Sequence, residues 1–362
     1  MAAKPHSPPP AAAPAVAPAA AGPDFEIGKL GPTPIRDLAL SLEESPLAPV
    51  LAELERELEG RGVRRPRPRF YLSTEWGVPF GTIAIAIPFY LARPDLTRLH
   101  AERTSFVEGL GRSDLLRYLR HEMGHVVNYA YRLYERAEWV RLFGSMTQAY
   151  VEEYRPRPFS RRFVRHLPGW YAQKHPDEDW AETFAVWLTP GHDWRTEYAA
   201  WPEALAKLEY CDRTMAELGG QEPPVTADDL DAEVSEIATP LDDYYRGLEP
   251  AADELPPGLD GALRSLFGDL VANAAAGPGA AADCRPAGEL IRGLGRHLPA
   301  EVYRWTGHFP ERTRRLLEQL AARADALRQV YPAAREHEAA VALTTFVTAL
   351  AMNYVHGGSY AP

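Results

Sequence analysis

Residues 115–134, LLRYLRHEMGHVVNYAYRLY, contain two histidines and a glutamate in the spacing His-Glu-x-x-His. On an α-helix, residues four apart lie on one face, so His121 and His125 project together and can both bind one Zn²⁺ through an imidazole. Glu122 lies beside them, within reach of a water on such a metal, in the position of a general base. The pattern therefore predicts a zinc site that activates water.

The residues around this motif indicate the helix independently, because they form one apolar and one polar stripe at helical spacing. The apolar stripe consists of Leu115, Leu119, Met123, Val126 and Ala130, and the polar stripe of Tyr118, His121, His125 and Asn128. The histidines are thus expected to face away from the apolar contact. The alternative is that they are solvated helix residues and bind no metal.

A second segment, HPDEDWAETFAVWLTPG, begins at His175 and carries two glutamates four residues apart, Glu178 and Glu182. Two carboxylates stacked on one helix face without basic partners repel each other, and a cation or a histidine proton would relieve this. A catalytic zinc has three protein ligands plus water. One glutamate can be the third ligand while the other orients a ligand histidine. The alternative is a plain acidic helix face.

The two segments together resemble the gluzincin metallopeptidases, in which the third ligand opens a motif E-x-aromatic-A-E. The aminopeptidase signature N-E-G-F-A-E and the E-F-F-A-E-A-F of the lethal-factor type are examples. The resemblance makes Glu178 the metal ligand, Trp180 the aromatic residue and Glu182 the outer carboxylate. Asp177 departs from the aminopeptidase Asn. A competing alignment of ETFA with E-F-F-A makes Glu182 the ligand instead.

The resemblance to the lethal-factor type also singles out Tyr171. That type has a catalytic tyrosine seven residues before the ligand glutamate, and Tyr171 lies seven residues before Glu178. A phenol in this place can donate a hydrogen bond to the developing oxyanion. Alternatively, Tyr171 is an ordinary packed tyrosine. His175 is a rival oxyanion donor, or a residue that caps the following helix.

Two strands are expected before the motif helix, RFYLS at 69–73 and an alternating stretch at 81–91 with Ile83, Ile85 and Ile87. Pro88 suits an edge strand. Zincins place such a strand before the His-Glu-x-x-His helix, and extended substrate pairs with its free edge. The resemblance, over about 46–218, implies an α+β fold: a zincin-like domain with a small mixed sheet, followed by an α-helical C-terminal region.

The helices expected around the site cover 46–59, 113–135, 176–188 and 202–218, and Pro176 suits a first helical turn. Composition divides the rest of the chain. We expect a disordered Pro/Ala-rich tail at 1–23, a zincin-like metallopeptidase domain at 24–218, a linker-like segment at 219–258 and a helical C-terminal region at 259–362.

The 362-residue chain has a formal net charge of −11 and a hydrophobic fraction of 46%, which indicates a real core and no nucleic-acid partner. The Arg-rich stretch 154–166 is expected to be a solvated loop. Two cysteines, Cys211 and Cys284, exclude a disulfide scaffold and favour a reduced compartment. Without a secretion signal or a membrane span in the sequence, the expected location is the cytoplasm.

Two functions remain open. The first is a zinc-dependent metallopeptidase with Zn²⁺ as cofactor, a peptide or protein as substrate and endopeptidase rather than exopeptidase action. The second is a non-catalytic zinc-binding protein whose helical C-terminal region is an interaction module. Glu122 favours the first, since a structural site gains nothing from it.

Overall fold

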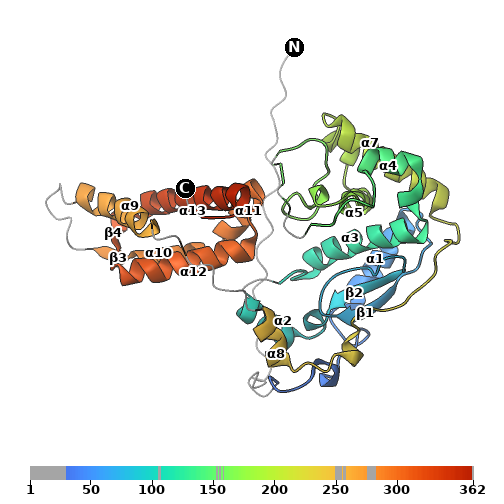
Figure 1. Ribbon diagram of the computed structural model, residues 1–362, viewed down its shortest axis with the longest axis horizontal. Helices are drawn as coiled ribbons and strands as arrows, with labels where there is room; N and C mark the ends of the chain where they lie inside the picture. Colours follow the sequence, from blue (N-terminus) through green and yellow to red (C-terminus); the bar gives the residue numbers. More distant parts are fainter. Residues whose placement is uncertain are drawn as a thin grey trace, which may run out of the picture.

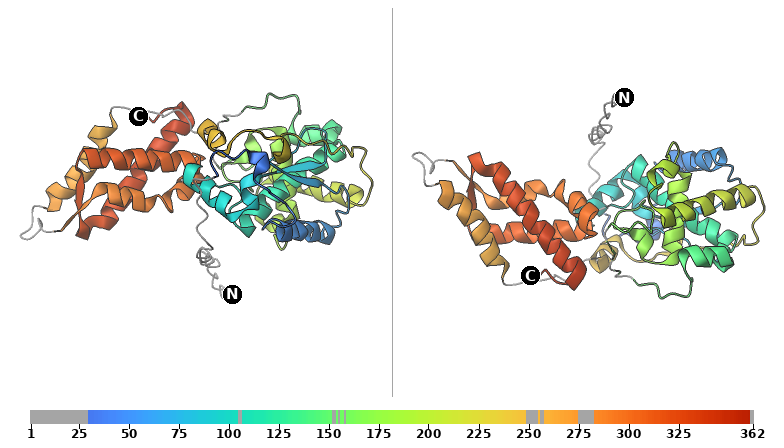
Figure 2. Two further views of the ribbon diagram at one scale, coloured as in Figure 1. Left: turned by 90° about the horizontal axis from the view of Figure 1, so that it is seen from below. Right: turned by 90° about the horizontal axis from the view of Figure 1, so that it is seen from above.

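The computed structural model describes residues 30–104, 107–151, 154, 156–157, 159–248, 255, 258–274 and 283–360. The tail expected at 1–23 lies outside these residues. Helices dominate the described chain, accompanied by two small two-stranded sheets (Figure 1). Helices α9 to α13 gather at one end, apart from α1 to α8, in all three views (Figures 1 and 2). Each group has its own hydrophobic core.

The first core is formed by residues from Ile35 to Tyr245. Its α-helices are α1 (Ala48–Gly60), α2 (Pro94–Thr104), α3 (Arg112–Ala130), α4 (Ala137–Phe143), α5 (Pro176–Leu188), α6 (Trp194–Glu197), α7 (Pro202–Leu218) and α8 (Leu241–Leu248). Short 3-10 helices are η2 (Ile35–Asp37), η3 (Phe89–Ala92), η4 (Leu133–Glu135), η5 (Tyr171–Gln173) and η6 (Val234–Glu236). The helices expected at 46–59, 176–188 and 202–218 are confirmed.

The motif helix α3 is shorter than the expected 113–135. It ends at Ala130 because Arg132 adopts a left-handed backbone with φ 49°, after which η4 begins. Both stripes of α3 are buried, since Leu119 and Met123 pack into the first core while His121 and His125 lie against α5. The alternative that both histidines are solvated is therefore wrong.

The sheet of the first core pairs β1 (Arg69–Ser73) with β2 (Ala84–Pro88) in parallel. Strand β2 is shorter than the expected 81–91, because the chain turns into η3 directly after Pro88. The other edge of β2 is not free, since the Ala86 N–H donates to the Gly77 carbonyl at 2.8 Å in an antiparallel bridge. A substrate strand would have to displace this contact.

The segment 219–258, expected to be a linker, packs against the first core over its described part up to Leu248. Val234, Leu241 and Tyr245 are buried in that core, and the Ile83 N–H donates to the Ala227 carbonyl at 2.7 Å. All five residues of β2 are therefore buried, with Ile85 in the main core and Ala86 on the opposite face. Over 219–248 the linker prediction is wrong, because Pro-rich composition does not reveal scattered apolar contacts.

The second core belongs to the C-terminal helices and lies among α9 to α13. The elements are α9 (Leu259–Ala274), β3 (Cys284–Pro286), α10 (Ala287–Leu294), α11 (Leu298–Thr306), α12 (Pro310–Ala326), β4 (Val330–Pro332), η7 (Ala333–Arg335) and α13 (Glu336–Gly357). Strands β3 and β4 pair antiparallel. The helical character expected for 259–362 is confirmed over the described residues.

Helix α11 and the glycine that follows it contact the loop before η5. The rings of Trp305 and Phe159 lie 6.2 Å apart. Gly307, with φ 75°, comes so close to Trp170 that a Cβ there would lie 3.2 Å from its ring. This contact joins the C-terminal helices to the segment that leads into Tyr171.

Helix α13 is the one described helix that is long and apolar enough to cross a membrane, with a mean hydropathy of 1.3 over its best window. It contributes Leu343, Val347 and Leu350 to the second core, which is the packing of a bundle helix. Both cysteines are free thiols; Cys211 is buried and Cys284 is exposed.

Candidate zinc centre

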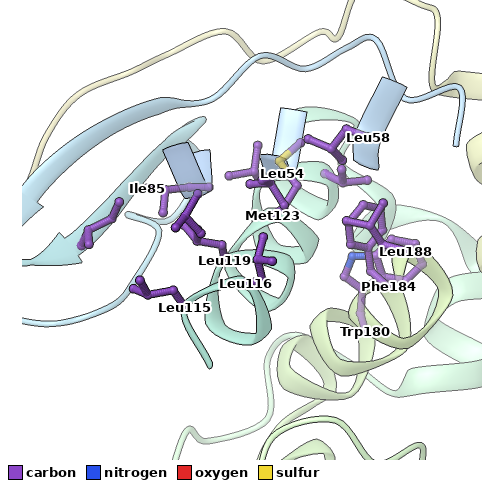
Figure 3. Close-up of a cluster of buried hydrophobic side chains, with 14 of the residues drawn as sticks. Leu54, Leu58, Ile85, Leu115, Leu116, Leu119, Met123, Trp180, Phe184 and Leu188 are labelled. Atoms are coloured by element: carbon purple, nitrogen blue, oxygen red, sulfur yellow. The ribbon is translucent and has the colours of Figure 1, made fainter. Parts of the chain in front are cut away.

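Helices α3 and α5 approach each other at Gly124, the fourth residue of the HEMGH motif. A Cβ on Gly124 would lie 2.7 Å from the Ala181 Cα, so only glycine allows this approach. The Trp180 indole N–H donates to the Gly124 carbonyl at 2.8 Å. Figure 3 shows Trp180 and Phe184 of α5 beside the core that Met123 and its neighbours form on α3. This packing brings the acidic first turns of α5 to the histidines.

All thirteen residues of α5 are buried, although four of them are carboxylates. The helix begins with Pro176 at a position that needs no N–H donor, and His175 caps it by accepting from the Asp177 N–H. Asp179 is paired with the buried Lys207 of α7 at 2.6 Å. The other three, Asp177, Glu178 and Glu182, face the histidines of α3.

His121, His125 and Glu178 bring three ligand atoms to one point. The Nε2 atoms of the two histidines are 3.1 Å apart, and Glu178 Oε2 lies 3.0 Å from His121 Nε2 and 3.3 Å from His125 Nε2. Nitrogen and oxygen ligands at about 2.0–2.1 Å from a tetrahedral zinc are roughly 3.3 Å from one another. The cluster, which is buried, is suited to binding zinc.

Glu182 does not contribute to that point, because its carboxylate contacts the far side of His121. Its Oε1 lies 3.0 Å from His121 Nδ1, and the carboxylate also accepts from the backbone N–H groups of His166 and Leu167. This holds the His121 ring so that Nε2 faces His125 and Glu178. The structure thus separates the two glutamates that the sequence left as alternatives.

Asp177 stands in the corresponding place beside His125. Its Oδ2 is 3.0 Å from His125 Nδ1, although this ion-pair contact is not aligned as a hydrogen bond. Asn128 donates to Asp177 Oδ1 at 2.7 Å, and the Tyr129 hydroxyl donates to Oδ2. Each histidine therefore has a carboxylate behind it, an arrangement that orients metal-binding imidazoles.

Glu122 lies next to the cluster and is only 5% exposed. Among the residues that the structure describes, its carboxylate has no hydrogen-bond partner, so it remains available to a water or a substrate. Burial raises the pKa of Glu122 above its usual value, although the two histidines beside it lower it. A carboxylate with a raised pKa is a better proton acceptor than a solvent-exposed carboxylate with the usual pKa.

Tyr171 lies in η5 next to the cluster, with its ring centroid 5.6 Å from that of His121. Its hydroxyl is 3.4 Å from the hydroxyl of Tyr150. Burial and the charge of Glu178 raise the pKa of Tyr171 well above its usual value, so the phenol stays protonated as a donor. His175 engages backbone at both ring nitrogens, the Asp177 N–H and the Gln148 carbonyl, and acts as a cap.

The charges of the site fit a divalent cation. Glu122, Asp177, Glu178 and Glu182 are 0–6% exposed, and burying several carboxylates without a cation is costly. Burial lowers the pKa of His121, but Glu178 and Glu182 raise it to about 9. Burial likewise opposes ionisation of Glu178, yet the histidines hold its pKa well below the usual range. The pocket thus favours positive charge, and zinc competes there with protons.

Two residues that shape this site carry no signal in the sequence motif. Tyr150 comes from the irregular stretch after α4, and its hydroxyl donates to Glu178 Oε1 at 2.6 Å. His166 supplies a backbone N–H to Glu182 while its ring contacts the Arg117 carbonyl at 2.9 Å. Asp177 could have been found from its place beside Glu178, as the residue that replaces the aminopeptidase Asn.

Comparison with known proteins finds a match to one family model over the part of the chain that holds the site. Residues 78–215 match the model of a family described as "Putative zinc-binding metallo-peptidase". No curated protein and no solved structure matches the chain. The matched residues include β2, α3, α5 and α7 as far as Met215, and thus every residue of the cluster. Over this stretch the chain is therefore similar to zinc-binding metallopeptidases.

Proposed function

We propose that the protein is a zinc-dependent metallopeptidase of the gluzincin type that hydrolyses peptide bonds. The observation that carries this proposal is Glu122, which lies beside a three-ligand cluster without a protein partner among the described residues. Three ligands leave a fourth position for water or substrate, as in catalytic rather than structural zinc sites. The helix-dominated fold with its small sheet is compatible with a zincin-like domain.

His121, His125 and Glu178 are the proposed zinc ligands. Glu178 is preferred to Glu182 because its Oε2 faces both Nε2 atoms, whereas Glu182 is held by His121 Nδ1 and two backbone N–H groups. Zinc bound by these ligands would lower the pKa of a water molecule and polarise the scissile carbonyl.

The side chains around the cluster supply the proton transfers. Glu122 takes a proton from the attacking water and delivers it to the leaving amine, for which its buried carboxylate with a raised pKa is suited. The Tyr171 hydroxyl donates a hydrogen bond to the oxyanion of the tetrahedral intermediate. Glu182 and Asp177 keep the imidazoles of His121 and His125 oriented through this cycle.

A second candidate is a zinc protein without catalysis, whose helical C-terminal region is an interaction module. The burial of the proposed ligands favours this candidate, since His121, His125 and Glu178 are only 2–7% exposed. Such a protein would use the same ligands but would not need Glu122.

The experiment that separates the two is cleavage of a broad peptide library by the zinc-loaded protein, wild type beside Glu122→Gln. We expect the wild type to cleave, and Glu122→Gln to lose roughly 100- to 10,000-fold in rate at unchanged zinc content. Cleavage of peptides with both termini blocked would support endopeptidase action. Equal cleavage by both proteins would refute Glu122 as the base, and no cleavage by either would favour the second candidate.

A further inference from the structure

The two oxygens of the Glu178 carboxylate have different partners. Oε2 lies 3.0 Å from His121 Nε2 and 3.3 Å from His125 Nε2, whereas Oε1 accepts a hydrogen bond from the Tyr150 hydroxyl at 2.6 Å. Hydrogen bonds to an ionised carboxylate are short and strong. A hydrogen bond to one oxygen restrains the rotation of the carboxylate plane, so Tyr150 occupies Oε1 while Oε2 faces the two Nε2 atoms.

Tyr150 reaches Glu178 from a segment that is fastened to the start of α5. The Gln148 carbonyl lies 3.2 Å from His175 Nε2, and the rings of Tyr150 and His175 are 5.4 Å apart. The Lys174 ammonium lies over the Tyr150 ring at 4.3 Å and over the Tyr171 ring at 5.3 Å. Because Tyr150 is 49% exposed, these contacts rather than core packing set its position.

A carboxylate can bind zinc through one oxygen or through both. Binding through both would take up space beside the two histidines that water and substrate need in a catalytic site. We propose that Tyr150 is a positioning residue for the third zinc ligand: its hydroxyl holds Glu178 to binding through Oε2 alone. This role rests on the proposed function of the site, and it adds a residue outside the HEMGH and EDWAE motifs to the zinc centre.

The test compares Tyr150→Phe with Tyr154→Phe, which removes a hydroxyl from the same stretch of chain. The Tyr154 hydroxyl donates to the Gly169 carbonyl at 2.8 Å and does not contact Glu178. Zinc affinity is measured by competition with a chelator of known affinity. We expect Tyr150→Phe to weaken zinc binding by about 10- to 100-fold, as loss of an outer partner of a ligand does. Tyr154→Phe should bind zinc like the wild type.

A second readout is the absorption spectrum of the protein loaded with Co²⁺ in place of zinc, since the visible bands report the number and geometry of ligands. Tyr150→Phe should shift these bands, because Glu178 can then bind through both oxygens. Unchanged zinc affinity, equal weakening in Tyr154→Phe, or weaker binding without a spectral shift would each overturn the proposal. Neither readout requires peptide cleavage, so failure of this proposal is distinguishable from failure of the peptidase proposal.

Discussion

Glu182 Oε1 and His121 Nδ1 lie 3.0 Å apart, with both side chains almost fully buried. Glu182 is held in turn by the N–H groups of His166 and Leu167, which precede the segment that carries Tyr171. One carboxylate therefore links the imidazole of α3 to the loop before η5. The orientation of the imidazole and the position of the loop depend on the same residue.

This relationship predicts the effect of Glu182→Gln. The amide keeps an acceptor but loses the charge, so the His121 ring is held less firmly and Nε2 becomes a weaker ligand. We expect zinc affinity to fall by about 10- to 100-fold without loss of the fold. Glu209→Gln, an exposed glutamate on α7, is the matched control and should leave the affinity unchanged. A folded Glu182→Gln protein with wild-type affinity would contradict this role.

The close approach of the two site helices predicts that Gly124→Ala is destabilising. The new Cβ would lie 2.7 Å from the Ala181 Cα, and a helix backbone cannot yield as a flexible side chain does. We expect a loss of about 1–3 kcal/mol in the free energy of unfolding, measured with urea on the zinc-free protein. Gly268→Ala in α9 is the control, since nothing lies within 4 Å of its Cβ position.

Gly268→Ala should leave the free energy of unfolding unchanged or raise it by about 0.5–1 kcal/mol, because alanine is the better helix former. If Gly124→Ala were as stable as the wild type, α3 and α5 would not be packed as closely as the structure shows.

The C-terminal core predicts a dependence of stability on pH. His308 is 1% exposed, with ring nitrogens 2.8 Å from Thr313 Oγ1 and 3.1 Å from the Tyr360 hydroxyl. Burial, with a smaller effect of Arg312, lowers its pKa from 6.5 to about 4. A histidine whose pKa is lower in the folded than in the unfolded chain contributes stability that is fully present when the pH is above the unfolded-state pKa. This contribution is lost as the pH falls toward 4.

The measurement is the free energy of unfolding in urea at pH 7 and pH 5, wild type beside His308→Gln. The variant should be less stable at pH 7 and should lose less stability on acidification. His356→Gln, at an exposed position of α13, serves as control and should follow the wild type. The same pH dependence in His308→Gln as in the wild type would contradict this account.

The local part of the site could be predicted from sequence because it depends on helical periodicity. His121 and His125 must share a face once α3 is a helix, and Pro176 with the following acidic turn marks the start of α5. The sequence also offered both Glu178 and Glu182 as partners of the histidines. Which of them faces Nε2 depends on how α5 is rotated against α3, and that rotation follows from the Gly124–Ala181 contact.

Features that join distant segments could not be predicted in this way. Tyr150 reaches Glu178 from an irregular stretch with no periodicity, and the 219–248 segment covers the sheet through a few scattered apolar residues. Alternation in 81–91 with Pro88 suggested an edge strand, yet β2 is buried on both faces and Gly77 pairs with its other edge. A pattern of side chains describes one segment and carries no information about which segment covers it.

Zinc content, measured by elemental mass spectrometry, tests whether His121, His125 and Glu178 form a three-ligand zinc site. Wild-type protein should carry one zinc per chain, and His121→Ala and Glu178→Ala should both lose it. Absence of zinc in the wild type, even after reconstitution, would show that these residues form no zinc site. Loss in His121→Ala but retention in Glu178→Ala would contradict Glu178 as the third ligand.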